Sequence, residues 1–199
     1  MKLSRSFYTR GDALSVARAL LGKRLVVPAP TGERVSGRVV EVEAYMGAGD
    51  RASHAYGNRR TPRTERMYAE GGCVYVYFVY GLHHQFNVVT GAAGVPEAVL
   101  VRAVEPLEGI ERMRRRRPGR PDRELTSGPG KLCRAFCLDL TYNGEDLVAG
   151  RRVWLEDAEP VPPEDVASGP RVGVDYAGAD ALLPYRLWLR DNPYVSRKA

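Results

Sequence analysis

The run from Val39 to His54, VVEVEAYMGAGDRASH, constrains the fold of this chain more than any other segment. Its first half alternates as a β-strand does, with successive side chains on opposite faces of a sheet. The apolar side chains would share one face, and Glu41, Glu43 and Tyr45 the other. The two glycines that follow let the chain turn, which would bring His54 back toward Tyr45.

Two interpretations of this run remain open from the run alone. A half-buried strand with solvated glutamates is the ordinary one, because polar alternation with a period of two is typical of a sheet that has one wet face. The other is a site that uses the two carboxylates. The chain has 199 residues, 44% of them hydrophobic and 27% charged, which is the composition of an ordinary globular protein. We expect one domain over residues 1–199.

Charge and cysteine usage narrow the possible partners and compartments. The net charge of +6 favours polyanionic partners. The chain has three cysteines, Cys73, Cys133 and Cys137, and an odd number does not suit a disulfide framework. We therefore expect reduced thiols in an intracellular protein. Structural zinc takes four ligands at recognisable spacing, and no second cysteine pair is present, so we expect no metal site. The chain has no membrane-length apolar run and no hydrophobic signal core at its N-terminus, so we expect neither membrane association nor a targeting signal.

Hydrophobic periodicity and turn residues predict many strands and few helices. Asp12 and Gly22 are typical start and stop residues for the first helix. Helices are predicted at 12–22, 105–117 and 127–138, and strands at 23–27, 35–45, 73–80, 85–90, 98–104, 153–156, 171–175 and 185–190. Residues 157–169 are predicted as a polar loop. Because short hairpins join most strands, we expect an α+β fold, a curved antiparallel β-sheet with surrounding helices and a protruding β-hairpin.

The segment from Cys73 to Tyr80, CVYVYFVY, is the strongest strand prediction because it is rich in β-branched and aromatic residues. We expect Tyr75 and Phe78 to lie in the core. Tyr80 stands at the predicted hairpin tip beside Gly81, where a side chain is hard to bury. An exposed aromatic residue there suits a wedge or a stacking platform.

Arg102 interrupts an otherwise apolar strand, AVLVRAV. A buried arginine needs an acidic partner, and Glu41 and Glu43 are the available acids on a neighbouring strand. A structural salt bridge is one interpretation of this arginine. The alternative is that Arg102 holds a catalytic carboxylate and a substrate water in place.

Three basic segments are candidates for phosphate contacts. Residues 50–72 are polar and irregular, which fits a mobile surface loop, but their arginines, among them Arg63 and Arg66, also suit phosphates. The arginines at 114–117 either complement the end of a helix dipole or extend a phosphate-binding surface. SGPGKL at 127–132 is a glycine-rich helix start with Lys131, which suits one bound anion. It lacks the spacing of a Walker loop, so a nucleoside triphosphatase is rejected.

Five motifs occur in a fixed order along the chain. They are VEVEAY with a downstream histidine, YVYFVYGLH with NVV, VRAVEPLEG, ELTSGPGKLC and RVGV. In this order and spacing the chain closely resembles the 3-methyladenine (alkyladenine) DNA glycosylase family. The resemblance extends from LLG at 20–22 to NPYVS at 192–196.

The resemblance implies a monofunctional DNA glycosylase of base excision repair. Such an enzyme flips an alkylated or deaminated purine out of double-stranded DNA, because the base cannot be reached inside the stack. It then hydrolyses the N-glycosidic bond with an activated water and leaves an abasic site, without lyase activity. The resemblance further implies a monomer that uses no cofactor and works in the cytoplasm or at the nucleoid.

The same resemblance implies roles for eight residues. Glu43 matches the general base that activates the water, Arg102 the arginine that positions it, and Val172 the residue whose carbonyl accepts its other hydrogen bond. The matches for the base pocket and the DNA wedge are Tyr45, His54 and Tyr77, which sandwich the base, Asn87, which discriminates against a guanine amino group, and Tyr80, which fills the gap in the duplex. Lys131, Arg63 and Arg66 remain candidates for the DNA backbone.

Two departures from the family pattern are visible. His83-His84-Gln85-Phe86 stands where a more apolar run is expected, which bears on base preference, and the loop at 91–97 is slightly longer than expected. Two other functions were weighed against the glycosylase. A zinc nucleobase deaminase needs a Pro-Cys-x-x-Cys element, which this sequence lacks. A non-catalytic damaged-DNA-binding protein would account for the charge and the aromatic residues, but not for an acid–arginine pair beside the pocket.

Overall fold

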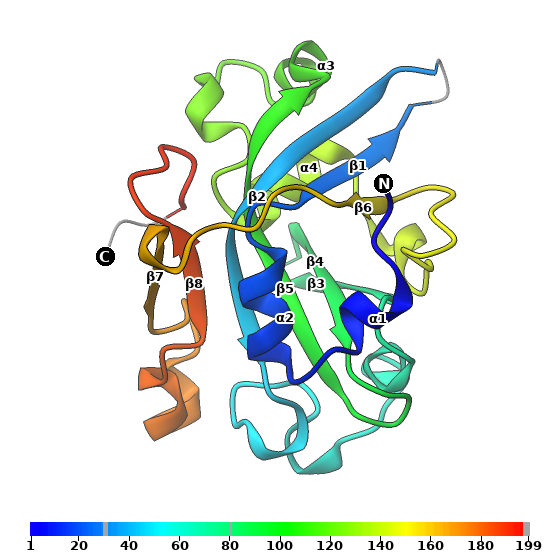
Figure 1. Ribbon diagram of the computed structural model, residues 1–199, viewed down its shortest axis with the longest axis vertical. Helices are drawn as coiled ribbons and strands as arrows, with labels where there is room; N and C mark the ends of the chain where they lie inside the picture. The colour runs from blue at the N-terminus through cyan, green and yellow to red at the C-terminus, as the bar shows by residue number, and fades with distance from the viewer. Residues whose placement is uncertain (30–31, 80, 197–199) are drawn as a thin grey trace.

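One antiparallel sheet of eight strands organises the part of the chain that this computed structural model describes, residues 1–29, 32–79 and 81–196 (Figure 1). Six strands lie in the order β3–β4–β5–β2–β1–β6, while β8 pairs with β2 and β7 pairs with β8. The strands are β1 Arg24–Pro28, β2 Arg34–Tyr45, β3 Val74–Val79, β4 His83–Thr90, β5 Glu97–Glu108, β6 Trp154–Glu156, β7 Val166–Gly169 and β8 Arg186–Leu189. The α-helices are α1 Arg5–Tyr8, α2 Ala13–Leu20, α3 Ile110–Arg116 and α4 Pro129–Phe136. The predicted curved antiparallel α+β fold is confirmed.

Strand β2 is the centre of the sheet because three strands pair with it. On one side it pairs with β5 from Ser36 to Tyr45. On the other side, residues 34–38 pair with β1 and residues 41–43 with β8, where Glu43 lies opposite Arg186. Residues 41–43 of β2 are buried on both faces of the sheet, and the side chains of Glu41 and Glu43 are 0% exposed. The interpretation of a half-buried strand with solvated glutamates is therefore wrong.

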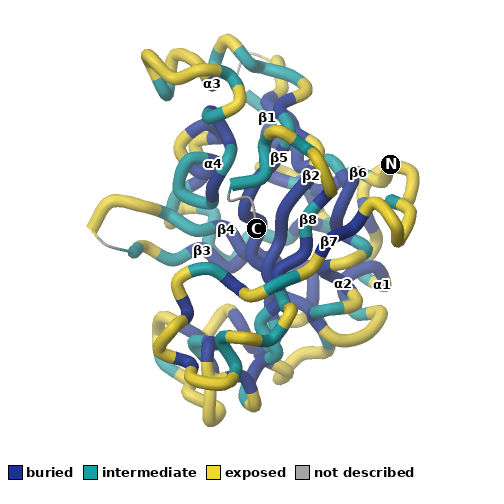
Figure 2. Tube along the Cα trace, turned by 90° about the vertical axis from the view of Figure 1, so that its left-hand side faces the viewer, coloured by how far each residue is buried: buried dark blue, intermediate teal, exposed yellow. Residues whose placement is uncertain are grey.

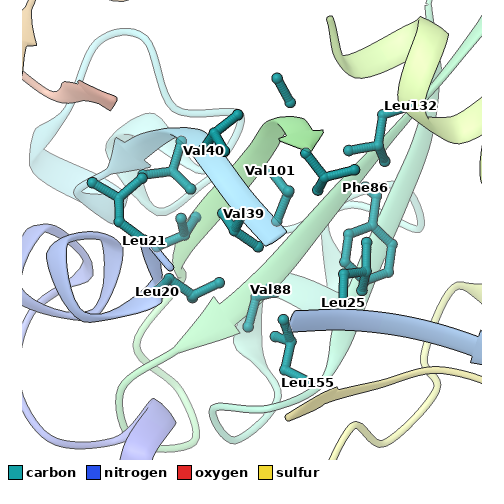
Figure 3. Close-up of a cluster of buried hydrophobic side chains, with 14 of the residues drawn as sticks. Leu20, Leu21, Leu25, Val39, Val40, Phe86, Val88, Val101, Leu132 and Leu155 are labelled. Atoms are coloured by element: carbon teal, nitrogen blue, oxygen red, sulfur yellow. The ribbon is translucent and has the colours of Figure 1, made fainter. Parts of the chain in front are cut away.

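The main core lies where α2 packs on β2 and β5 and α4 packs on β4 and β5. Figure 3 shows its side chains, with Leu20 and Leu21 from the α2 region meeting Val39 and Val40 of β2. The predicted cap of α2 is confirmed, since the Ser15 backbone N–H donates to Asp12 Oδ1 at 2.8 Å.

The segment 46–72 is folded over the opposite face of the sheet. It contains three short 3-10 helices, Gly47–Gly49, Tyr56–Asn58 and Glu65–Tyr68. Its side chains Ala55 and Met67 pack with Tyr75 and Val89 in a second cluster. Tyr75 and Val89 alternate with strand neighbours that belong to the main core, so this cluster lies on the other face. The segment is thus anchored to the sheet at these positions, while residues 56–60 and 62–63 between them are exposed, as expected for a surface loop.

The hairpin of β3 and β4 protrudes from the body of the molecule (Figure 2). Near its tip, Phe78 is 43% exposed and Leu82 66% exposed. The prediction that Phe78 lies in the core is thus wrong, whereas Tyr75, 2% exposed, is buried as predicted. Tyr80 lies outside the described residues, so its wedge role stays a prediction.

Three predicted elements differ in the structure. β5 continues to Glu108, and α3 begins only at Ile110, after Gly109 with its positive φ of 73°. The predicted helix start at residues 105–108 is therefore wrong. The predicted strand at 171–175 is absent from the described structure, where a 3-10 helix, Asp175–Leu182, begins instead. The predicted loop 157–169 contains β7. Among the described residues, no helix has the length and apolarity needed to cross a membrane.

Candidate active site

Glu43 is held by three donors at the junction of β2, β5 and the segment after β7. The Val172 backbone N–H donates to its Oε1 at 2.7 Å, and the Tyr45 hydroxyl donates to Oε2 at 2.9 Å. Arg102 Nη1 lies 3.1 Å from Oε1. The carboxylate lines an open cleft, which is bounded further by Leu100, Arg102, Val172 and Tyr77 and by Pro129 at the start of α4. These contacts fix the carboxylate in one orientation toward the cleft.

Glu41, two residues earlier, is a buried counterion for two arginines. Arg102 Nε lies 2.7 Å and Arg186 Nε 2.8 Å from its Oε1. The backbone N–H of Ser196 donates to Oε2 at 2.6 Å. Burial alone would raise the pKa of Glu41, but the Arg102 charge, the Ser196 N–H and the Arg186 charge outweigh it and hold the pKa below its usual range. The prediction that Arg102 meets Glu41 or Glu43 is confirmed, since it meets both.

Behind the cleft lies a cavity with aromatic walls, which we call the aromatic cavity. It is lined by Tyr45, Ala52, His54, Met67, Tyr75, Tyr77, Asn87, Ala98 and Tyr176. Four tyrosine and histidine side chains, Tyr45, His54, Tyr77 and Tyr176, line both the cleft and the cavity, so the two spaces adjoin. The structure thus brings together all four residues predicted for the base pocket, and places the predicted catalytic residues in the adjoining cleft.

Hydrogen bonds and ring contacts fix the walls of the aromatic cavity. The rings of His54 and Tyr77 meet edge to face, with centroids 4.6 Å apart. His54 Nδ1 lies 2.9 Å from the hydroxyl of Tyr75. Asn87 Nδ2 donates to the carbonyls of Tyr75 at 3.0 Å and Gln85 at 3.2 Å, which locks the amide in place. Each of these side chains is therefore positioned before any ligand arrives.

Burial shifts the ionisation of the polar groups in the cavity. It raises the pKa of Tyr45 well above its usual value, and the nearby Glu43 charge adds to this. Burial lowers the pKa of His54 to about 4, with the positive charge of Arg63 adding to the effect. The tyrosines and the histidine are therefore uncharged near neutral pH.

Asp50 and Arg171 form a buried ion pair that sequence analysis missed. Arg171 Nη2 donates to Asp50 Oδ1 at 2.8 Å, and Nη1 donates to the Ala44 carbonyl at 3.0 Å. The guanidinium also lies over the ring of Tyr45, 4.9 Å from its centroid. The pair thus ties the segment after β2 to the segment that carries Val172. Two features of the sequence could have indicated this ion pair, an arginine directly before Val172 in RVGV and an aspartate in the loop after Tyr45.

Two further tyrosines line the aromatic cavity without having been predicted there. Tyr75 lies two residues before Tyr77 on β3, so a period of two places both on one face. Tyr176 follows the RVGV motif in the 3-10 helix, where no periodic pattern reveals which side chains face a cavity. Its hydroxyl donates to the Ala52 carbonyl at 3.1 Å.

A basic groove adjoins the cleft, and we call it the arginine groove. It is lined by Arg51, Ser53, His54, Tyr56, Arg59, Thr61, Arg63, Thr64 and Tyr176. Arg63 thus lies beside the cleft, and its contact with the DNA backbone stays a prediction. Lys131 is in the first turn of α4, whose Pro129 lines the cleft. Arg66 instead lies against Gly144 and lines none of these three spaces.

Two arginines in the last turn of α3 have partners within the protein. Arg114 pairs with Glu111 and Asp122, and Arg116 Nη1 donates to the Ala135 carbonyl at 2.8 Å. For these two, the contacts favour the interpretation of a structural helix end. Among the described residues, no group of three or more histidine, cysteine, aspartate or glutamate side chains has the arrangement of a metal site.

The basic α+β fold thus carries a buried carboxylate, held by an arginine, beside a cavity with aromatic walls. A family model for methylpurine-DNA glycosylases matches residues 6–193. The chain belongs to this family.

Relatives of nearly the same length share close to half of their residues with this chain. Each is named "Putative 3-methyladenine DNA glycosylase". The protein of Desulfitobacterium hafniense is 46% identical, with 99% of each chain covered. That of Alkaliphilus oremlandii is 45% identical over all of both chains. That of Myxococcus xanthus is 49% identical, covering 98% of this chain and 93% of its own.

Proposed function

We propose that this protein is a monofunctional DNA glycosylase that excises alkylated or deaminated purines, 3-methyladenine among them, from double-stranded DNA. The damaged nucleotide rotates out of the duplex and its base enters the aromatic cavity. A water activated by Glu43 then hydrolyses the N-glycosidic bond and leaves an abasic site. The observation that carries this proposal is the buried Glu43 carboxylate in the cleft that adjoins the aromatic cavity, with Arg102 Nη1 3.1 Å from it.

The proposed chemistry needs a base for water and a negative charge beside the sugar. As the bond between the base and C1′ breaks, its electrons leave with the base and positive charge develops on the sugar. Glu43 takes a proton from the water while the water oxygen bonds to C1′, and the carboxylate charge stabilises the transition state. Arg102 and the Val172 carbonyl position that water, while the Val172 N–H orients Glu43.

The aromatic walls would select damaged purines through stacking. Tyr45, His54 and Tyr77 present π-faces to a flipped base, and each stacked base contributes about 1–3 kcal/mol. This gain offsets a flipping cost of a few kcal/mol, which is least for a damaged pair. Asn87, locked by two hydrogen bonds, would form the wall that excludes a guanine amino group.

The remaining features support binding to a duplex and a water nucleophile. The protruding β3–β4 hairpin would enter the duplex, with Tyr80 as the wedge, and Arg63, Arg66 and Lys131 would contact phosphates. None of the described residues lining the cleft or the aromatic cavity is a lysine. A Schiff base and strand cleavage are therefore not expected.

The test is single-turnover incubation of labelled duplexes that each carry one lesion, followed by alkali to cut at abasic sites. We expect breaks with the wild-type protein only after alkali, and a rate at least 100-fold lower for Glu43→Gln, since general-base catalysis contributes about 10²–10⁴-fold. Lesion binding by the variant should persist. Breaks without alkali would contradict a monofunctional enzyme, and lesion binding with no breaks from either protein would indicate a non-catalytic damage-binding protein.

A further inference from the structure

The segment NPYVS, residues 192–196, follows β8 and has no role in the proposed chemistry, yet it reaches the buried side chains behind the cleft. Asn192 Nδ2 donates to Glu105 Oε2 of β5 at 3.1 Å, and Asn192 Oδ1 accepts the Tyr194 N–H at 3.0 Å. The Tyr194 side chain packs against the main core. These contacts hold the segment against the sheet and place Ser196 next to the buried ion pairs.

All three nitrogens of the Arg102 guanidinium have a partner. Nε donates to Glu41 Oε1 at 2.7 Å, and Nη1 lies 3.1 Å from Glu43 Oε1. The third nitrogen, Nη2, donates to the Ser196 hydroxyl at 3.2 Å. A planar group that is bound at three corners cannot rotate without breaking one of its contacts. The direction of Nη1 toward Glu43 therefore depends on the other two contacts.

Ser196 joins Arg102 to Glu41 in a closed ring of hydrogen bonds. Its hydroxyl donates to Glu41 Oε1 at 2.9 Å and accepts from Arg102 Nη2, so both its proton and its oxygen are used. The same Glu41 oxygen accepts from Arg102 Nε, which closes the ring. The donor in each bond is fixed by chemistry, because a carboxylate only accepts and a guanidinium only donates. The Ser196 backbone N–H holds the other Glu41 oxygen, Oε2, at 2.6 Å.

Charge balance does not account for the hydroxyl in this ring. Glu41 already has two cationic partners, Arg102 and Arg186, whose Nε atoms lie 2.7 and 2.8 Å from its Oε1. Arg102 in turn has two carboxylate partners, Glu41 and Glu43. The buried charges are thus compensated without Ser196. A hydroxyl adds no charge, so what Ser196 contributes is orientation.

We propose that Ser196 is a positioning residue for the hydrolytic step. Together with Glu41 it fixes the guanidinium of Arg102, so that Nη1 is aimed at Glu43 and at the attacking water. Ser196 does not line the cleft and acts through Arg102. A displacement of about 1 Å in a catalytic arrangement can cost about 10²-fold in rate, so a group that aims Arg102 bears on catalysis. The effect on rate rests on the proposed glycosylase function, whereas the effect on Arg102 does not.

The orientation of Arg102 is tested without DNA. In ¹⁵N NMR spectra, a guanidinium that cannot rotate about its Nε–Cζ bond gives separate signals for Nη1 and Nη2, and rotation averages them. Arg102→Lys, which keeps the positive charge, assigns the signals of Arg102. We expect separate signals in the wild type, faster exchange between them in Ser196→Ala, and separate signals again in Ser196→Thr, which keeps the hydroxyl. An averaged signal in the wild type, or no change in Ser196→Ala, would overturn the proposal.

Ser168→Ala is the matched control. Ser168 lies on β7 in the same sheet, and its exposed hydroxyl has no hydrogen-bond partner among the described residues. Removing it is the same chemical change, and it should leave the Arg102 signals and the excision rate as they are in the wild type. Changes of the same size in Ser168→Ala and Ser196→Ala would overturn the proposal.

A second measurement carries the inference to catalysis. Single-turnover excision at saturating enzyme should be about three- to tenfold slower in Ser196→Ala, the range expected for one lost hydrogen bond, with lesion affinity unchanged. Ser196→Thr should keep the wild-type rate. In the Arg102→Lys background Ser196→Ala should have no further effect, because residues that act through one another are not additive.

The outcomes separate this inference from the glycosylase proposal. An equal fold-loss from Ser196→Ala in the wild-type and Arg102→Lys backgrounds would overturn the role through Arg102. A weakened lesion affinity with an unchanged excision rate would also overturn it. Inactivity of the wild type on every lesion would contradict the glycosylase proposal, and the NMR spectra would then decide whether Ser196 orients Arg102.

Discussion

At the scale of single residues, His54 shows how the fold changes ordinary acid–base behaviour. Its ring is packed against Tyr77, and Arg63 faces it from the arginine groove. Burial and this positive charge lower its pKa to about 4, whereas a histidine in an unfolded chain titrates near 6.5. Between these two values the unfolded chain binds more protons than the folded protein.

The free energy of unfolding should therefore fall as the pH falls through this window. The expected loss is about 2 kcal/mol between pH 7 and pH 5 from His54 alone. Urea unfolding at several pH values compares the wild type with His54→Gln, which cannot titrate. The decline should be smaller in the variant by that amount, and parallel curves for the two proteins would contradict the lowered pKa.

At the scale of elements, the Asp50–Arg171 pair holds two irregular segments together. One carries His54 and the other carries Val172, and neither has a strand ladder to fix it. Both side chains are buried, at 2% and 0% exposed. The cavity and the cleft are therefore positioned by one ion pair rather than by the sheet alone.

Asp50→Asn should destabilise the protein by about 3–5 kcal/mol, because it leaves the buried Arg171 charge without its counterion. Thermal or urea unfolding measures the change. Asp122→Asn neutralises one of the two acidic partners of the exposed Arg114 and is the control, for which little change is expected. Equal effects of the two substitutions would contradict a special role for the buried pair.

The sequence predicted the sheet and most of the site, and its errors have local causes. The residues 105–108, EPLE, look like a helix start, but they remain a strand because β2 supplies a pairing partner as far as Ser36, which lies opposite Glu108. Tyr75 was assigned only to the core, although alternation with Tyr77 pointed to the cavity. Arg171 and Tyr176 lie in irregular backbone, where no period relates a residue to the face it presents.

At the scale of the whole molecule, some arginines form ion pairs with carboxylates and others do not. Arg114 and Arg152 lie in ion pairs. Arg51 and Arg59 line the arginine groove, and within the described residues their guanidinium groups have no carboxylate partner. They are free to meet phosphates if the proposed DNA substrate binds there.

The double variant Arg51→Gln/Arg59→Gln should therefore have a flatter salt dependence of DNA affinity. The slope of log K against log salt should decrease by about 0.9 for each lost phosphate contact. Fluorescence anisotropy at a series of salt concentrations measures it. Arg114→Gln is the control and should keep the wild-type slope, and an unchanged slope in the double variant would remove the arginine groove from the DNA interface.

One side of β2 is shared between β1 and β8, and this has a consequence for folding during synthesis. Glu41, Glu43 and Arg102 leave the ribosome early, but Val172, Arg186 and Ser196 are synthesised at least 70 residues after Arg102. Until β8 docks beside β2, the two carboxylates lack these donors and the cleft lacks one wall. A nascent chain thus contains Glu43 before it contains the donors that orient this carboxylate. The site is complete only when β7 and β8 have joined the sheet beside β2.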